Sequence, residues 1–203
     1  MLAAPRGLAD LYVFSPQQRL AQLDARNETP GPAEWTRARQ DLQRALELDP
    51  HNPAHFELLA RWYERYTLRL APASSLIPAY LEQAAAHLRR AAAARPASPY
   101  TWANLALVKL RLAQYDAEFQ TAVANAWRLG PWEPEVQLAL AQIAFRAWPQ
   151  LGADAQDAAR SAMRNALRRY DRELFQLARL HGALPVLCAV PRASASPLSA
   201  ACP

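Results

Sequence analysis

Prolines divide this sequence into segments of helical length. Asn52-Pro53 and Ser98-Pro99 each place a helix-capping residue before a proline at the first helical position, where the missing N–H costs no hydrogen bond. Ser15-Pro16 repeats the pattern, and Gly130, Gly152 and Gly182 are typical of helix ends. Together these signals predict helices at 16–26, 33–48, 53–70, 78–94, 99–112, 115–129, 134–148, 153–169 and 172–181.

The composition agrees with an all-helical chain. The 203 residues include 45 Ala and 30 Leu, both strong helix formers, against only 13 β-branched residues. This balance argues against an all-β or α/β fold. Five glycines are also too few to build several phosphate-binding loops.

A repeated pattern runs through the predicted helices. In the best copy, Ala38, Leu42 and Ala45 precede the turn Asp49-Pro50, and large and small apolar residues resume in register beyond it. The pattern resembles the tetratricopeptide repeat (TPR), in which a small residue lets two antiparallel helices approach closely. Turn prolines at 50, 96 and 131 mark three copies, and the copies continue at Phe56, Leu59, Ala60, Tyr63, Ala84, Leu88, Ala91, Trp102, Leu105, Ala106, Val123, Ala126, Leu140 and Ala141.

We therefore predict an all-α, TPR-like right-handed superhelix of antiparallel helix pairs, with about eight or nine helices. Lys109 stands where the repeat usually has a tyrosine, and Met163, Ala166, Leu174 and Leu177 mark a degenerate closing unit. A helical bundle without repeats is the alternative. The expected organisation is a partly helical segment at 1–31, a repeat domain at 32–182 and a disordered tail at 183–203.

In an array of this kind the first helix of each pair lines a groove, and such a groove suits an extended or helical segment of a protein partner. We expect the groove to be mixed in character. Its predicted lining is Glu57, Arg61, Glu64, Tyr100, Ala103, Leu107, Glu135, Leu138 and Gln142.

A second candidate surface is basic. The net charge of +5 rests on 22 Arg and a single Lys, a skew that a GC-rich coding genome also explains. Four arginines spaced by four residues form one stripe if their helix continues past Tyr170. This stripe supports the alternative function of binding an anionic polymer, either nucleic acid or acidic polysaccharide. Its residues are Arg160, Arg164, Arg168, Arg169 and Arg172.

Catalysis is not expected. No phosphate loop, zinc-protease motif or nucleophile elbow is present, and the four histidines fall on different segments without other ligands at metal spacing. We predict a non-enzymatic protein with no metal, no cofactor and no small-molecule substrate. Cys188 and Cys202 could remain free thiols or close one small loop.

Three stretches carry a narrower resemblance: the segment 96–107, then 116–119 (Asp116-Ala-Glu-Phe) with 129–137 (Leu129-Gly-Pro-Trp-Glu-Pro-Glu-Val-Gln), and finally 177–182. They are similar to the VpsP-like family of bacterial exopolysaccharide biosynthesis accessory proteins, over roughly residues 35–188. The resemblance implies a TPR-like scaffold for protein–protein interactions, with polysaccharide synthesis or export components as partners and no catalytic residues.

The same resemblance implies attachment to the bacterial inner membrane through an N-terminal helix. The longest uncharged run here, Pro96 to Val108, has 13 residues, whereas spanning a bilayer takes about 20. Two expectations stay open: a soluble protein, or one held at the membrane by an anchor upstream of the given residues.

Overall fold

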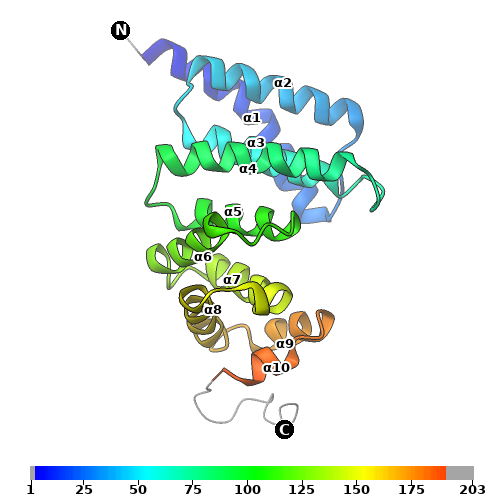
Figure 1. Ribbon diagram of the computed structural model, residues 1–203. Coiled ribbons are helices and arrows are strands. Elements are labelled where there is room, and N and C mark those ends of the chain that lie inside the picture. The colour runs from blue at the N-terminus through cyan, green and yellow to red at the C-terminus, as the bar shows by residue number, and fades with distance from the viewer. Residues whose placement is uncertain (1–2, 191–203) are drawn as a thin grey trace. The chain divides into compact units, whose positions relative to one another are not determined.

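The computed structural model describes residues 3–190 (Figure 1). This described part contains ten α-helices and one short 3-10 helix, and no strand. The chain forms two compact units, Met1–Pro96 and Ala97–Pro203.

The first unit consists of two helix pairs. Helix α1 packs against α2, and α3 packs against α4, so each pair joins neighbours in the sequence (Figure 1). Helix α2 also contacts α3, which joins the two pairs into one unit. The four helices are α1 (Ala3–Arg26), α2 (Pro32–Leu48), α3 (Pro53–Thr67) and α4 (Leu76–Ala94).

The second unit repeats this plan. Helix α5 packs against α6, α7 against α8 and α9 against α10, while α5 also packs on α7 and α6 on α8. First helices therefore stack on first helices and second helices on second helices, which is the arrangement of a helical repeat. The elements are α5 (Pro99–Arg111), α6 (Ala117–Leu129), α7 (Pro134–Ala147), η1 (Trp148–Gln150), α8 (Ala153–Ala166), α9 (Asp171–Leu180) and α10 (Leu184–Cys188).

Two predicted caps form as expected. The Asn52 side chain accepts a hydrogen bond from the Ala54 amide (3.0 Å), and the Ser98 hydroxyl accepts one from the Thr101 amide (3.4 Å). In both cases a proline occupies the first helical position. The sequence punctuation thus fixes where α3 and α5 begin.

The predicted helix start at Ser15-Pro16 is wrong, because α1 begins at Ala3 and continues through Pro16. A proline inside a helix removes one backbone hydrogen bond and costs about 3 kcal/mol. Pro16 is buried here, and its carbonyl accepts a hydrogen bond of 3.1 Å from the indole N–H of Trp62 on α3.

The small residues of the predicted repeat lie where the helices meet. Ala60 on α3 and Ala106 on α5 are fully buried, as are the leucines that precede them. The other predicted core positions that are buried are Ala38, Leu42, Ala45, Phe56, Tyr63, Ala84, Leu88, Ala91, Val123, Ala126, Leu140, Ala141, Met163, Ala166 and Leu174.

An aromatic cluster fills the first unit. Tyr63 of α3 lies edge-on to Trp35 of α2, with ring centroids 4.8 Å apart, and it stacks on His87 of α4 at 5.6 Å. His87 also stacks on Phe56. Burial, helped by the charge of Arg90, lowers the pKa of His87 to about 4. The cluster therefore holds a neutral imidazole at neutral pH.

The only lysine of the chain, Lys109, is buried in the second unit with 1% of its surface exposed. Its ammonium donates hydrogen bonds to Asp116 (2.9 Å) and Glu118 (2.6 Å), which lie at the start of α6. Burial lowers the pKa of Lys109, but the hydrogen bonds to the two carboxylates outweigh burial and leave it raised. A charged group thus joins the end of α5 to α6 at the position where the repeat usually has a tyrosine.

The C-terminal part is more ordered than predicted. The expected tail begins at 183, but the structure has α10 there, with Leu187 and Val190 buried. The rest of the predicted tail, including Cys202, lies outside the described residues. Among described helices, none is long and apolar enough to cross a membrane.

We expect Lys109→Met to lower the free energy of unfolding by about 2 kcal/mol, because methionine keeps the apolar stem but loses two hydrogen bonds to charged groups. Urea unfolding followed by circular dichroism measures this change. Arg146→Met, at an exposed position of α7, is the matched control and should change little. Equal effects for both variants would show that the Lys109 pairs contribute no stability.

A second prediction concerns pH. The unfolded state binds a proton at His87 near the ordinary pKa of 6.5, whereas the folded state binds it only at about 4. The contribution of His87 to the free energy of unfolding is therefore fully present above pH 6.5. It decreases as the pH drops toward 4, by at most about 3 kcal/mol.

His87→Phe keeps a ring at this position but cannot titrate. Urea unfolding at pH 7 and pH 4.5 should show a smaller loss of stability for this variant than for the wild type. The same loss in both proteins would mean that other groups account for the acid sensitivity.

Candidate protein-binding surfaces

Three of the predicted groove residues lie on the exposed side of α3 in the first unit. Arg61 pairs with Asp24 of α1 (Nη2–Oδ2 2.5 Å), and Glu57 accepts two hydrogen bonds from Arg95 (2.8 Å each). Glu64, the third residue, is half-buried. Ion pairs within the first unit therefore hold Arg61 and Glu57 in place on this surface.

On α5, the predicted residues differ in exposure. Tyr100 is exposed, and its hydroxyl donates a short hydrogen bond to Glu133. That bond to a carboxylate, which favours the protonated phenol, raises the pKa of Tyr100 to about 12. Leu107 is half-buried, but Ala103 is buried, so its predicted place in a groove lining is wrong.

The last three predicted residues lie on α7, which packs against α5. Glu135 is exposed, and Leu138 and Gln142 are half-buried. The second unit thus offers a mixed surface on two neighbouring first helices. A groove that joins the residues of α3 to those of α5 and α7 stays a prediction, because these helices belong to different units.

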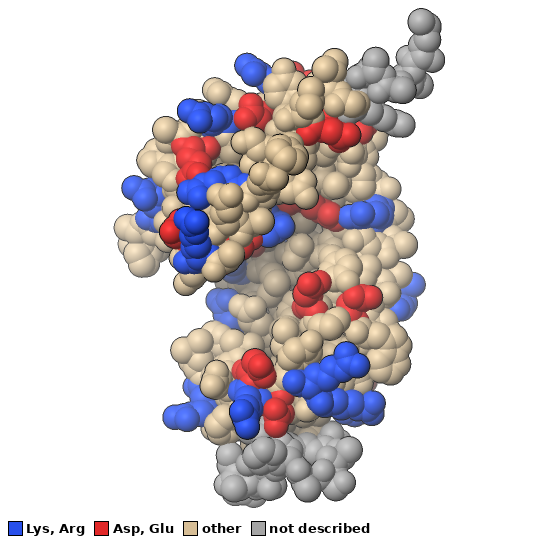
Figure 2. Space-filling view, turned by 180° about the vertical axis from the view of Figure 1, so that it is seen from behind, with Lys and Arg blue, Asp and Glu red and all other residues tan. Residues whose placement is uncertain are grey.

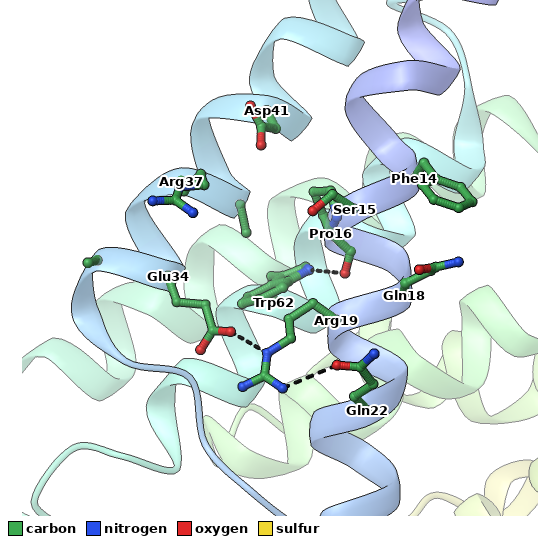
Figure 3. A pocket seen from close by; sticks show the side chains of 12 residues that line it. Phe14, Ser15, Pro16, Gln18, Arg19, Gln22, Glu34, Arg37, Asp41 and Trp62 are labelled. Carbon is green, nitrogen blue, oxygen red and sulfur yellow. Dashed lines mark hydrogen bonds and ion pairs between the residues drawn. The ribbon is translucent and has the colours of Figure 1, made fainter.

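A cavity that the sequence did not predict lies between α1, α2 and α3. Its volume is about 620 Å³, and Trp62 of α3 forms part of its lining (Figure 3). Arg19 of α1 pairs with Glu34 of α2 and donates a second hydrogen bond to Gln22 (3.3 Å). Sequence reasoning missed this cavity because it placed the start of the first helix at residue 16.

The cavity is lined by apolar, polar and charged side chains. Exposed Phe14 offers apolar contact, while Arg37 and Asp41 offer charges of both signs. None of the described residues that line it is a histidine or a cysteine. Within the described residues, no group of His, Cys, Asp and Glu could hold a metal ion.

The predicted arginine stripe depends on a continuous helix, and this condition is not met. Helix α8 ends at Ala166 and α9 begins at Asp171, with turns between them. A turn separates the two helices, and α9 begins at Asp171 after Tyr170 and packs on α7. The stripe is thus divided among two helices and a turn, in the order Arg160 and Arg164, then Arg168 and Arg169, then Arg172.

The stripe residues also differ in their surroundings. Arg160 pairs with Asp157 (2.7 Å) and lies over the Trp148 ring at 5.0 Å. Arg164, Arg168, Arg169 and Arg172 are exposed. Basic and acidic side chains are interspersed over much of the face drawn in Figure 2.

Among solved structures, this chain is similar to TTC0263, a thermophilic TPR protein of Thermus thermophilus. The two share 20% sequence identity with a TM-score of 0.51, and the alignment covers 91% of this chain and 100% of the other. The fold is TPR-like. No family model matches the sequence, and no curated protein matches it.

The hydrogen bond between Trp62 and the Pro16 carbonyl can be tested by Trp62→Phe. This change removes the donor and leaves a small void beside α1, so the free energy of unfolding should fall by about 1–2 kcal/mol. Trp132→Phe makes the same change at a side chain that is 73% exposed and should have little effect in the same urea titration. Equal stability of the two variants would argue against an anchoring role for Trp62.

Proposed function

We propose that this protein is a non-enzymatic scaffold that binds protein partners through its helical repeats. The observation that carries the proposal is the stacking of like helices in the second unit of a TPR-like fold, where Tyr100 of α5 and Glu135 of α7 remain exposed. Such stacks present a rigid surface, and rigidity reduces the entropy lost when a partner segment binds.

Partner contacts are proposed separately on α3 of the first unit and on α5 and α7 of the second. Arg61, Tyr100 and Glu135 are exposed there, and the first two are held in place by hydrogen bonds to Asp24 and Glu133. Aromatic and arginine side chains are the residue types that most often dominate binding energy at protein interfaces. A protein segment is therefore a better match to this surface than a small molecule.

The pathway is a finer proposal. The stretches 96–107, 116–119 with 129–137, and 177–182 resemble the VpsP-like family, so we place the scaffold in bacterial exopolysaccharide biosynthesis or export. Its partners would then be synthesis or export components. This part of the proposal depends on that resemblance.

Both the scaffold proposal and the pathway proposal can be tested by one experiment. The tagged protein is purified from its native cells in detergent, and the proteins that copurify are identified by mass spectrometry. Arg61→Glu combined with Tyr100→Ala should reduce the recovery of specific partners by about fivefold or more. Glu135→Arg provides a second variant that breaks no observed hydrogen bond. Arg146→Glu, also on α7 and exposed, is the control.

Partners that resist high salt and are lost in the groove variants would support the scaffold. Recovery of nucleic acid or polysaccharide alone, released by high salt, would contradict it, because polymer binding through many charges weakens steeply with salt. Specific partners from other pathways would overturn only the finer proposal. Circular dichroism shows whether each variant is folded.

A further inference from the structure

A small cavity of about 150 Å³ lies in the second unit where two inter-helix turns meet. One turn joins α6 to α7 and carries Trp132, and the other joins α8 to α9 and carries Arg168, Arg169 and Tyr170. The cavity shares no residue with the predicted groove. It has room for about five water molecules, or for one small polar group of a ligand.

Hydrogen bonds and a close contact hold the backbone of the turn that carries Trp132. The carbonyl of Pro131 accepts hydrogen bonds from the side-chain amides of Gln137 (2.8 Å) and Asn165 (3.2 Å). Gly130 lies so close to Pro99 that an added Cβ would be 2.6 Å from the proline Cβ. Two side-chain amides, the buried Gln137 and the half-buried Asn165, thus hold the backbone beside Trp132, together with the close contact between Gly130 and Pro99.

The side chain that this turn presents has no role in the core. Trp132 is 73% exposed, although its neighbours are fixed. An exposed indole on a rigid backbone loses little entropy on binding and offers a large apolar face. The turn therefore has the properties of a binding anchor.

The charges at the cavity are of one sign. Arg168 and Arg169 line it, both are exposed, and neither side chain has an ion-pair partner in the described part of the chain. No carboxylate of residues 3–190 lines the cavity. Guanidinium groups bind carboxylates in a planar, two-point geometry, so a single carboxylate suits this site.

Acidic residues lie next to this basic site in the sequence. Asp171 and Glu173 follow in the first turn of α9, and Glu133 lies next to Trp132 in sequence. A long polyanion would bring several negative charges close to these carboxylates. A peptide with one acidic side chain among apolar neighbours avoids that repulsion.

We propose that this cavity binds an acidic side chain of a protein partner, with the carboxylate at Arg168 and Arg169. The adjacent apolar or aromatic side chain of the partner lies on Trp132. The site gives the second unit a binding surface of its own, and it does not depend on the groove.

The test uses the full-length protein and a synthetic positional-scanning peptide library that is acetylated and amidated at its ends. Selection should enrich Asp or Glu next to Trp, Phe or Leu. Fluorescence anisotropy then measures Kd for the selected peptide and for the same peptide with Gln in place of Glu or Asn in place of Asp. The uncharged peptide should bind about tenfold more weakly.

Two variants should weaken binding to a similar extent: Trp132→Ala, and the double variant Arg168→Glu with Arg169→Glu. Both changes are at exposed positions, and circular dichroism verifies folding. Arg164→Glu removes an exposed arginine of α8 that does not line the cavity, so its Kd should stay unchanged.

No enrichment of an acidic residue beside an apolar one would overturn the proposal, and so would an equal loss of binding in Arg164→Glu. Heparin and single-stranded DNA are the polyanion probes. Tighter binding of either probe than of the selected peptide, weakened by all of the arginine variants, would also overturn it and indicate a general basic surface instead.

Discussion

Close contact between alanine-lined helices is the constraint on which this structure depends. Ala60, Ala106 and Ala141 are fully buried at corresponding positions of three successive first helices. A side chain of one carbon lets two helix backbones approach, and the larger leucines beside each alanine fill the groove that remains. A larger residue at any of these positions would push the two helices of that pair apart and disturb the packing around them.

Sequence patterns predicted the helix pairs well because the information is local. Caps at Asn52 and Ser98, turn prolines and small residues recur in register, so each pair is specified by its own residues. Long-range packing was not predictable in the same way. Pro16 lies inside α1, where its carbonyl accepts a hydrogen bond from Trp62, 46 residues later, and no signal near residue 16 indicates this contact.

Surfaces were predicted less well than the core. Periodicity places Glu57, Arg61 and Tyr100 on exposed helix faces, but it does not show that two of them are bound to residues outside the repeat pattern, Asp24 and Arg95. The arginine stripe failed because the spacing of four residues is meaningful only within one helix, and the chain turns after Ala166. The cavity beside Trp132 combines two turns that are far apart in the sequence, one with Trp132 and the other with Arg168.

The burial of Lys109 has a consequence for the chemistry of the protein surface. Since this is the only lysine in the chain, no lysine side chain is exposed for acetylation, ubiquitination or attachment of amine-reactive cross-linkers. The positive charge of the surface comes from arginine, whose guanidinium stays protonated across the physiological pH range. That positive charge is therefore set by the sequence and is insensitive both to lysine modification and to physiological changes in pH.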